Sequence, residues 1–169
     1  MNSQAHILYV DDEENNLIAF RASFRRLFKI YIASSAAEAK VILAENDIHV
    51  LISDQKMPGT PGIELLEEAL KKYPDQVRIL LTAYSDFEVL KKAVNNGYIF
   101  KYIIKPWDES ELKDIIKQAH ALYTKNRSSE KPIPDVESRK AYLEDEIRKL
   151  EEVLAQKKEV IEKFIDGRT

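Results

Sequence analysis

The carboxylate of Asp54 is the side chain whose setting most clearly indicates chemistry. It comes just after the run Val50–Ile52, which is apolar and partly β-branched, and the turn sequence Pro58-Gly59 follows soon after. An apolar run that ends in a carboxylate and then in a turn is typical of a buried parallel strand whose last residue reaches a loop. Asp54 is therefore the candidate reactive group.

Further polar groups end other apolar runs in the same way: Asp11, Asp12, Thr82 and Lys105. If these runs are parallel strands, their carboxyl ends share one edge of a sheet. Carboxylates held close repel one another unless a proton or a divalent cation intervenes, and a small all-oxygen site suits Mg²⁺. One carboxylate could then attack a phosphoryl group while a hydroxyl and an ammonium stabilise its oxygens. The pattern predicts an aspartyl-phosphate site.

Strand-like and helix-like segments alternate along the chain and would position these groups. We expect strands over 5–10, 29–33, 50–54, 77–81 and 98–104, and helices over 15–27, 35–45, 63–73, 86–95 and 108–123. Five such βα units without a hairpin signal predict a doubly wound, five-stranded parallel α/β sheet with helices on both faces. Two helical faces expected to point inward are Leu17, Phe20, Phe24 and Leu27, and Ile63, Leu66, Leu70 and Tyr73.

Composition narrows the class of protein. The 169 residues suit one domain plus an appendage, and a net charge of −3 gives no basic field for nucleic acid or anionic lipid. The absence of cysteine excludes disulfides, thiol catalysis and thiolate metal sites. The amino terminus does not resemble a signal peptide, and no apolar run approaches the ~20 residues that span a bilayer. We expect a cytoplasmic protein without membrane or direct nucleic-acid contact.

The sequence resembles the response-regulator receiver domain of two-component signalling over residues 7–123. The resemblance rests on Asp11-Asp12, on Asp54 followed by Met57-Pro58-Gly59, on Thr82-Ala83, on Tyr102 and on Lys105-Pro106. It implies a flavodoxin-like (βα)5 fold, a Mg²⁺ cofactor, and a phosphoryl group received from a sensor histidine kinase or a phosphotransfer protein. It also implies that the chain is no enzyme beyond its own phosphorylation and dephosphorylation.

The same resemblance implies a role for each strand-end residue. Asp54 is the phosphoacceptor, and Thr82 and Lys105 contact the phosphoryl group. The implied Mg²⁺ ligands are Asp11 (through water), Asp12, Asp54 and the backbone carbonyl of Lys56. Tyr102 resembles the switch aromatic of the family, which turns inward when Thr82 is drawn toward the phosphate and so remodels the surface of helix four, strand five and helix five.

Two other functions stay open. A receiver-like scaffold that never takes phosphate and dimerises through its tail predicts the same fold without a Mg²⁺-dependent change. A Mg²⁺-dependent phosphatase of the haloacid-dehalogenase kind would carry Asp-x-Asp on its first strand, where this chain has Glu13 at the third position. His6, His49 and His120 lie far apart in the sequence and away from the expected edge, so we assign them surface or core-edge positions and expect no zinc site.

The chain changes character after Tyr123. We expect a receiver domain over 1–125, a polar, proline-bearing linker over 126–134 and a helix over 135–166. Steps of four and three connect Val136, Lys140, Leu143, Ile147, Leu150, Leu154, Lys157, Ile161 and Phe164. This heptad seam predicts a coiled coil through which two copies pair over 136–164, and the alternative is a helix that lies on its own domain. No effector domain follows, which leaves open whether the chain is a fragment of a longer protein that carries an output domain.

Overall fold

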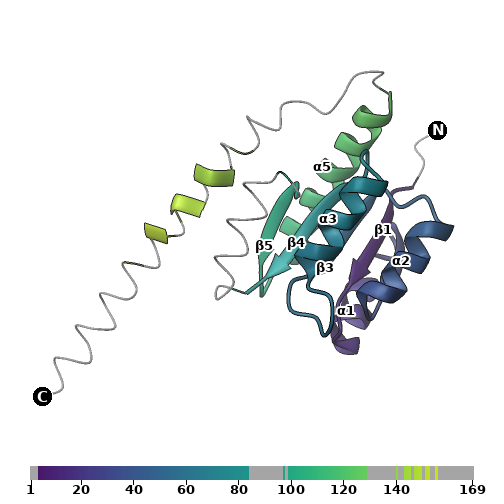
Figure 1. Cartoon of the computed structure of the whole chain (residues 1–169), viewed down its shortest axis with the longest axis horizontal. Coiled ribbons are helices and arrows are strands. Elements are labelled where there is room, and N and C mark those ends of the chain that lie inside the picture. Colours follow the sequence, from purple (N-terminus) through teal and green to yellow (C-terminus); the bar gives the residue numbers. More distant parts are fainter. Residues whose placement is uncertain are drawn as a thin grey trace, which may run out of the picture.

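The computed structural model describes residues 4–83, 97 and 99–128 and, in the tail, 140, 143–145, 147–149, 151–152 and 155. Its elements are β1 (His6–Val10), α1 (Glu14–Phe24), β2 (Lys29–Ala33), α2 (Ala36–Glu45), β3 (Val50–Asp54), α3 (Gly62–Lys72), β4 (Val77–Thr82), β5 (Lys101–Ile104) and α5 (Glu109–Ser128). All strand pairs are parallel, in the order β2-β1-β3-β4-β5. Figure 1 shows β1, β3, β4 and β5 in this order across the sheet. The doubly wound five-stranded α/β fold is confirmed.

Two hydrophobic cores lie on opposite faces of this sheet. One contains Leu66 of α3 and Ala39 of α2 together with Leu8 and Leu51. The other contains aromatic side chains of α1 and apolar side chains of α5 together with Tyr9, whose neighbour Leu8 faces the first core. Because successive strand residues point to opposite faces, strands covered on both sides must be apolar throughout, as β3 and β4 nearly are.

The strand order places the polar strand ends together. The chain order reverses at β1, which pairs with β2 on one side and with β3 on the other. Asp54 pairs with Leu81, and Thr82 pairs with Ile104, so β3, β4 and β5 end in register. The carboxyl ends of β1 and β3 form the switch point of the sheet, where open α/β sheets bind their ligands.

Two expected inward faces are partly wrong. The first helix ends at Phe24, so Leu27 lies outside it and is 48% exposed, while Phe28 is buried in its place. In α3 the buried side chains are Leu65, Leu66 and Ala69, whereas Ile63, Leu70 and Tyr73 are only half-buried. Hydrogen bonds from the amides of Gly62 and Ile63 to Gln55 fix the first turn of α3 against the end of β3 and so set which face packs on the sheet.

Other boundaries also differ from expectation. The fifth strand starts at Lys101 instead of residue 98, and α5 continues to Ser128, which lies within the range expected to be linker. The expected helix over 86–95 lies outside the described residues, as does most of the range 135–166. The described tail residues are helical. No helix in the described part of the chain is long and apolar enough to cross a membrane.

Candidate functional site

The ammonium of Lys105 joins two carboxylates at the switch point of the sheet. Its Nζ lies 2.5 Å from Asp54 Oδ1 and 2.9 Å from Asp11 Oδ2. Both carboxylates are buried, with 1% of Asp11 and 6% of Asp54 exposed. Burial alone would lower the pKa of Lys105, but its hydrogen bonds to Asp54 and Asp11 raise it above the usual value. The structure therefore brings together three of the residues selected from the sequence.

The carboxylate of Asp11 is held from several sides. Tyr9 donates a hydrogen bond from its hydroxyl to Oδ2 at 2.5 Å, and the Asn16 side-chain amide lies 3.1 Å from both oxygens. The amide of Glu13 donates to Oδ1 at 3.0 Å. Burial would raise the pKa of Asp11, but the hydrogen bonds, from Tyr9 first and then Lys105, lower it. Asp11 thus remains a fixed anion.

Sequence reasoning did not identify Tyr9 and Asn16 as parts of the site. Tyr9 stands two residues before Asp11, and residues at this spacing on a strand point to the same side. The spacing indicates that the two side chains lie on the same side of the strand, but it does not show that they contact each other. Asn16 lies in the first turns of α1, which covers β1, and only the packing of that helix brings its amide to Asp11.

The other carboxylate is fixed by the loop after β3. The amide of Lys56 donates to Asp54 Oδ2 at 2.7 Å, while the Lys56 side chain is exposed. A Cβ added at Gly62 would lie 2.0 Å from the Asp54 carbonyl oxygen, so only glycine allows α3 to begin this close to the strand. Burial raises the pKa of Asp54, and Lys105 partly offsets this rise. Asp54 combines a fixed position with a more basic carboxylate.

Thr82 lies beside these groups at the end of β4. It is 1% exposed, and its backbone carbonyl accepts a hydrogen bond from the Lys105 amide at 2.8 Å. Its hydroxyl contacts the carbonyl of Ala83 at 3.3 Å. The hydroxyl is therefore at the same edge as Asp54 and Lys105, the position expected from the sequence.

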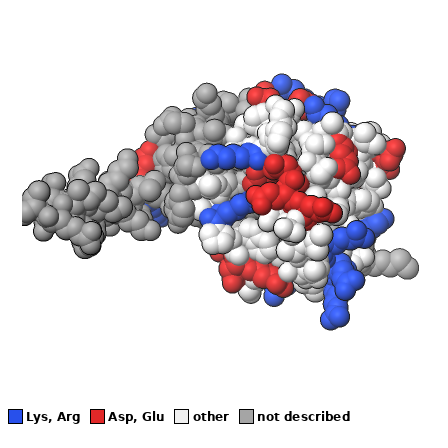
Figure 2. Space-filling view, turned by 90° about the horizontal axis from the view of Figure 1, so that it is seen from below, with Lys and Arg blue, Asp and Glu red and all other residues white. Residues whose placement is uncertain are grey.

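Asp12 differs from Asp11 and Asp54 because it is exposed. Figure 2, viewed from below Figure 1, shows a central patch of Asp and Glu side chains with Lys and Arg side chains beside it, and smaller acidic groups elsewhere on this face. Within the described residues, no three His, Cys, Asp or Glu side chains are already grouped to hold a metal ion. The carboxylate oxygens of Asp11, Asp12 and Asp54 nevertheless fit Mg²⁺ by their chemistry, since this cation takes hard oxygen ligands and keeps several waters.

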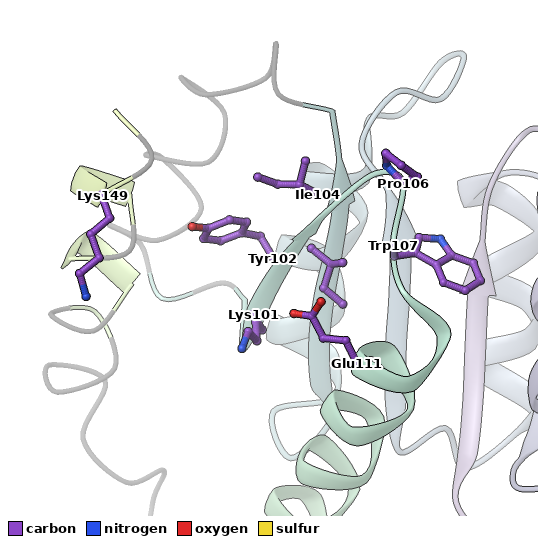
Figure 3. A pocket seen from close by; sticks show the side chains of 8 residues that line it. Lys101, Tyr102, Ile104, Pro106, Trp107, Glu111 and Lys149 are labelled. Carbon is purple, nitrogen blue, oxygen red and sulfur yellow. The ribbon is translucent and has the colours of Figure 1, made fainter. Parts of the chain in front are cut away.

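Tyr102 is central in β5 and is 6% exposed. It belongs to the same core as Leu80 and Ile99, and Ile104 packs against that core. Figure 3 shows a pocket around this strand, with Tyr102 and Ile104 pointing away from the sheet toward the tail. The candidate switch residue therefore lies on the surface of β5 that the tail approaches.

The three histidines meet at the opposite edge of the sheet, a cluster that sequence reasoning missed. The ring of His49 stacks on those of His6 and His120, at centroid distances of 4.7 and 5.1 Å, and on Tyr123 at 4.4 Å. Burial, followed by the neighbouring histidines, lowers the pKa of His49 to about 4. Pairing of the strands brings these rings together, although the residues lie far apart in the sequence.

Residues 7–117 match the response regulator receiver domain family. Among curated relatives, the hydrogenase transcriptional regulatory protein HoxA of Cupriavidus necator is 38% identical over 118 residues, which are 70% of this chain and 24% of HoxA. The transcriptional regulator NtrC of Escherichia coli is 30% identical over 122 residues, which are 71% of this chain and 26% of NtrC. The chain spans about a quarter of the length of these relatives.

Solved structures agree. A CheY-like receiver domain protein of Methanospirillum hungatei aligns with a TM-score of 0.69 and 29% identity over 73% of this chain and 99% of that one. The response regulator TrrA of Thermotoga maritima, solved in complex with Mg²⁺ and BeF, aligns with a TM-score of 0.61 and 30% identity over 68% of this chain and 98% of that one. By sequence match, fold and site geometry, this chain belongs to the response regulator receiver domain family.

Proposed function

We propose that this chain is a phosphorylation-switched receiver in which Asp54 accepts a phosphoryl group from a sensor histidine kinase or a phosphotransfer protein. The observation that carries this proposal is the Lys105 ammonium held between Asp11 and Asp54. One Asp54 oxygen forms a bond to phosphorus while the bond from phosphorus to the donor's histidine nitrogen breaks. The Thr82 hydroxyl and the Lys105 ammonium then donate to the phosphoryl oxygens.

The carboxylates at the strand ends also bind the proposed cofactor, Mg²⁺. The proposed ligands of Mg²⁺ are Asp11, Asp12, Asp54 and the backbone carbonyl of Lys56. When bound, the ion supplies positive charge that reduces repulsion between the carboxylates and the phosphoryl oxygens. The chain itself fixes the nucleophile: the Lys56 amide orients one oxygen of Asp54, and the Tyr9 hydroxyl keeps Asp11 in place.

The proposed output passes through the surface around Tyr102. Movement of Thr82 toward the phosphoryl group opens space beside β5, and Tyr102 responds to it. Relatives such as HoxA and NtrC are named as transcriptional regulators, and each is about four times as long as the part of it that matches this chain. We infer that the signal reaches an output domain outside this chain, and that two copies pair through the seam over 136–164.

The test is a titration with beryllofluoride, which mimics a phosphoryl group on aspartate. With Mg²⁺ present, the amide spectrum of the wild type should change around Tyr102, and Asp54→Asn should not respond. Asp12→Ala should need a higher Mg²⁺ concentration to respond, while Lys105→Ala should bind beryllofluoride without the spectral change around Tyr102. Lys29→Ala, at the amino end of β2, is the matched lysine control and should respond like the wild type. A wild type that never responds would favour the phosphorylation-independent scaffold.

A further inference from the structure

Two seam residues of the tail are buried in the core of the receiver. Leu143 is 1% exposed and Ile147 is 5% exposed, and both belong to the hydrophobic cluster that contains Tyr102. Glu144 and Arg148, one position further along the helix in each case, are exposed. Residues four apart lie on one face of a helix, so the tail buries one apolar stripe on its own domain.

The place of this contact is the β5 surface. Figure 3 shows Tyr102 and Ile104 directed toward the turn that carries Lys149, and Lys149 lines the same pocket as Lys101 and Tyr102. The other side chains of this turn are polar, and Asp145 pairs with Arg148 and with Lys149. Among the described tail residues, Leu143 and Ile147 form the apolar stripe, and the β5 surface covers it.

The same two side chains belong to the seam that predicts pairing with a second copy. One side chain cannot fill the β5 surface and the interface of a coiled coil at the same time. We propose that the tail docks on the β5 surface of its own chain and withholds its seam from a second copy, and that a phosphoryl group on Asp54 releases it. The release step rests on the function proposed above, whereas the docking itself does not.

The short linker between α5 and the tail favours the docked monomer. Eleven residues separate Ser128 from Lys140, and a short linker gives the tail an effective concentration on the order of millimolar at its own domain. Two lysines interrupt the seam, Lys140 and Lys157, which weakens pairing between chains. At micromolar concentrations the intramolecular contact therefore prevails until a change at Tyr102 weakens it.

The absence of cysteine allows a direct test with single thiols in the 169-residue chain. Ile147→Cys places a thiol in the buried stripe, and Ala155→Cys places the control at an exposed, non-seam position of the same segment. Without activator, the thiol at 147 should react with a maleimide about tenfold more slowly than the one at 155. With Mg²⁺ and beryllofluoride in dilute protein, this difference should fall to about twofold or less.

Pairing with a second copy is tested with the same variants at a higher protein concentration. With activator and diamide as oxidant, Ile147→Cys should form an interchain disulfide faster than Ala155→Cys. Light scattering should show a monomer without activator and a dimer with it.

Several results would overturn the proposal. Equal maleimide rates at 147 and 155 without activator would show that the tail is not docked. A dimer without activator would assign the protection at 147 to a coiled coil. Protection that persists when fluorine NMR shows bound beryllofluoride would mean static packing without a switch. If no beryllofluoride or phosphate binds at all, the proposed function and the release step fail together, while the rates without activator still decide whether the tail docks.

Discussion

Tyr9 donates a 2.5 Å hydrogen bond to Asp11 Oδ2 from a fully buried ring that stacks on Phe20 at 4.3 Å. The bond couples the phenylalanine-rich core under α1 to a carboxylate that also contacts Lys105. It makes the position of Asp11 a consequence of packing on one face of the sheet. Tyr9 thereby acts as a positioning residue for the site.

Tyr9→Phe removes this donor and keeps the ring. The pKa of the Asp11 carboxyl in metal-free protein should rise, because burial then opposes the charge with fewer hydrogen bonds. A depressed carboxyl pKa adds stability above the usual aspartate pKa, and this stability is lost as pH falls through the folded-state pKa. The variant should therefore lose about 1–2 kcal/mol at neutral pH and less at acid pH.

Carbon NMR of the aspartate carboxyls and urea unfolding at several pH values measure both effects. Tyr73→Phe, a half-buried tyrosine at the end of α3, is the control and should leave Asp11 unchanged. An Asp11 pKa that stays the same in Tyr9→Phe would show that the hydroxyl does not hold the carboxylate.

Gly62→Ala should be among the most damaging small changes in the chain. The added methyl group would meet the Asp54 carbonyl oxygen, and backbone cannot move aside as a flexible side chain can. We expect a loss of about 3 kcal/mol in the free energy of unfolding. At Gly59 φ is +82°, and beyond the neighbouring residues no heavy atom lies within 4 Å of an added Cβ, so alanine meets only backbone strain of about 1 kcal/mol. Urea unfolding of both variants gives the comparison, and equal losses would contradict it.

Thr82→Ala should suppress the response of Tyr102 to beryllofluoride while leaving Mg²⁺ affinity nearly unchanged. The reason is that Thr82 lies beside Lys105 at the strand ends, whereas the proposed Mg²⁺ ligands are carboxylates and a backbone carbonyl. Thr82→Ser keeps the hydroxyl and should restore the response. Amide and tyrosine-ring NMR signals report it, and a full response in Thr82→Ala would remove Thr82 from the switch.

The histidine stack should make the fold sensitive to mild acid. The pKa of His49 lies at about 4, below the usual value for histidine, so the native state stays neutral while the unfolded state takes up a proton. The contribution of neutral His49 to the free energy of unfolding is fully present above pH 6.5. It falls between pH 6.5 and pH 4, by at most roughly 3 kcal/mol.

His49→Phe keeps a ring between His6 and Tyr123 and removes the titrating group. Its loss of stability between pH 6.5 and 4 should be smaller than that of the wild type in urea unfolding. His120→Phe serves as a comparison and should change the pH profile less, because His120 is only half-buried and its lowered pKa has fewer causes. Identical pH profiles for the wild type and His49→Phe would contradict a buried neutral His49.

The site was largely predictable because strand ends can be recognised from the sequence. Apolar runs that stop at Asp11, Asp54, Thr82 and Lys105 indicate four ends, and parallel topology alone brings them to one edge. The contacts were not predictable in the same way. The bond from Tyr9 and the limit on Gly62 depend on exact interatomic distances, which no pattern of residue types contains.

Helix faces and the tail show a second limit. Leu27 and Phe28 are both apolar, and only the end of α1 at Phe24 decides which of them is buried. Leu143 and Ile147 fit a seam between two chains and a stripe on one domain equally well, since both need apolar residues at the same helical spacing. Periodicity predicts a buried face without naming what covers it.

The most direct measurement of the central claim is the mass of the protein after incubation with a small phosphodonor and Mg²⁺, followed by mapping of the modified peptide. The wild type should gain one phosphoryl group, on the peptide that contains Asp54, and Asp54→Asn should gain none because its amide is no nucleophile. Lys101→Ala, with a lysine removed elsewhere on β5, should be phosphorylated like the wild type. A phosphoryl group on Asp11 or Asp12, or one retained in Asp54→Asn, would contradict the account.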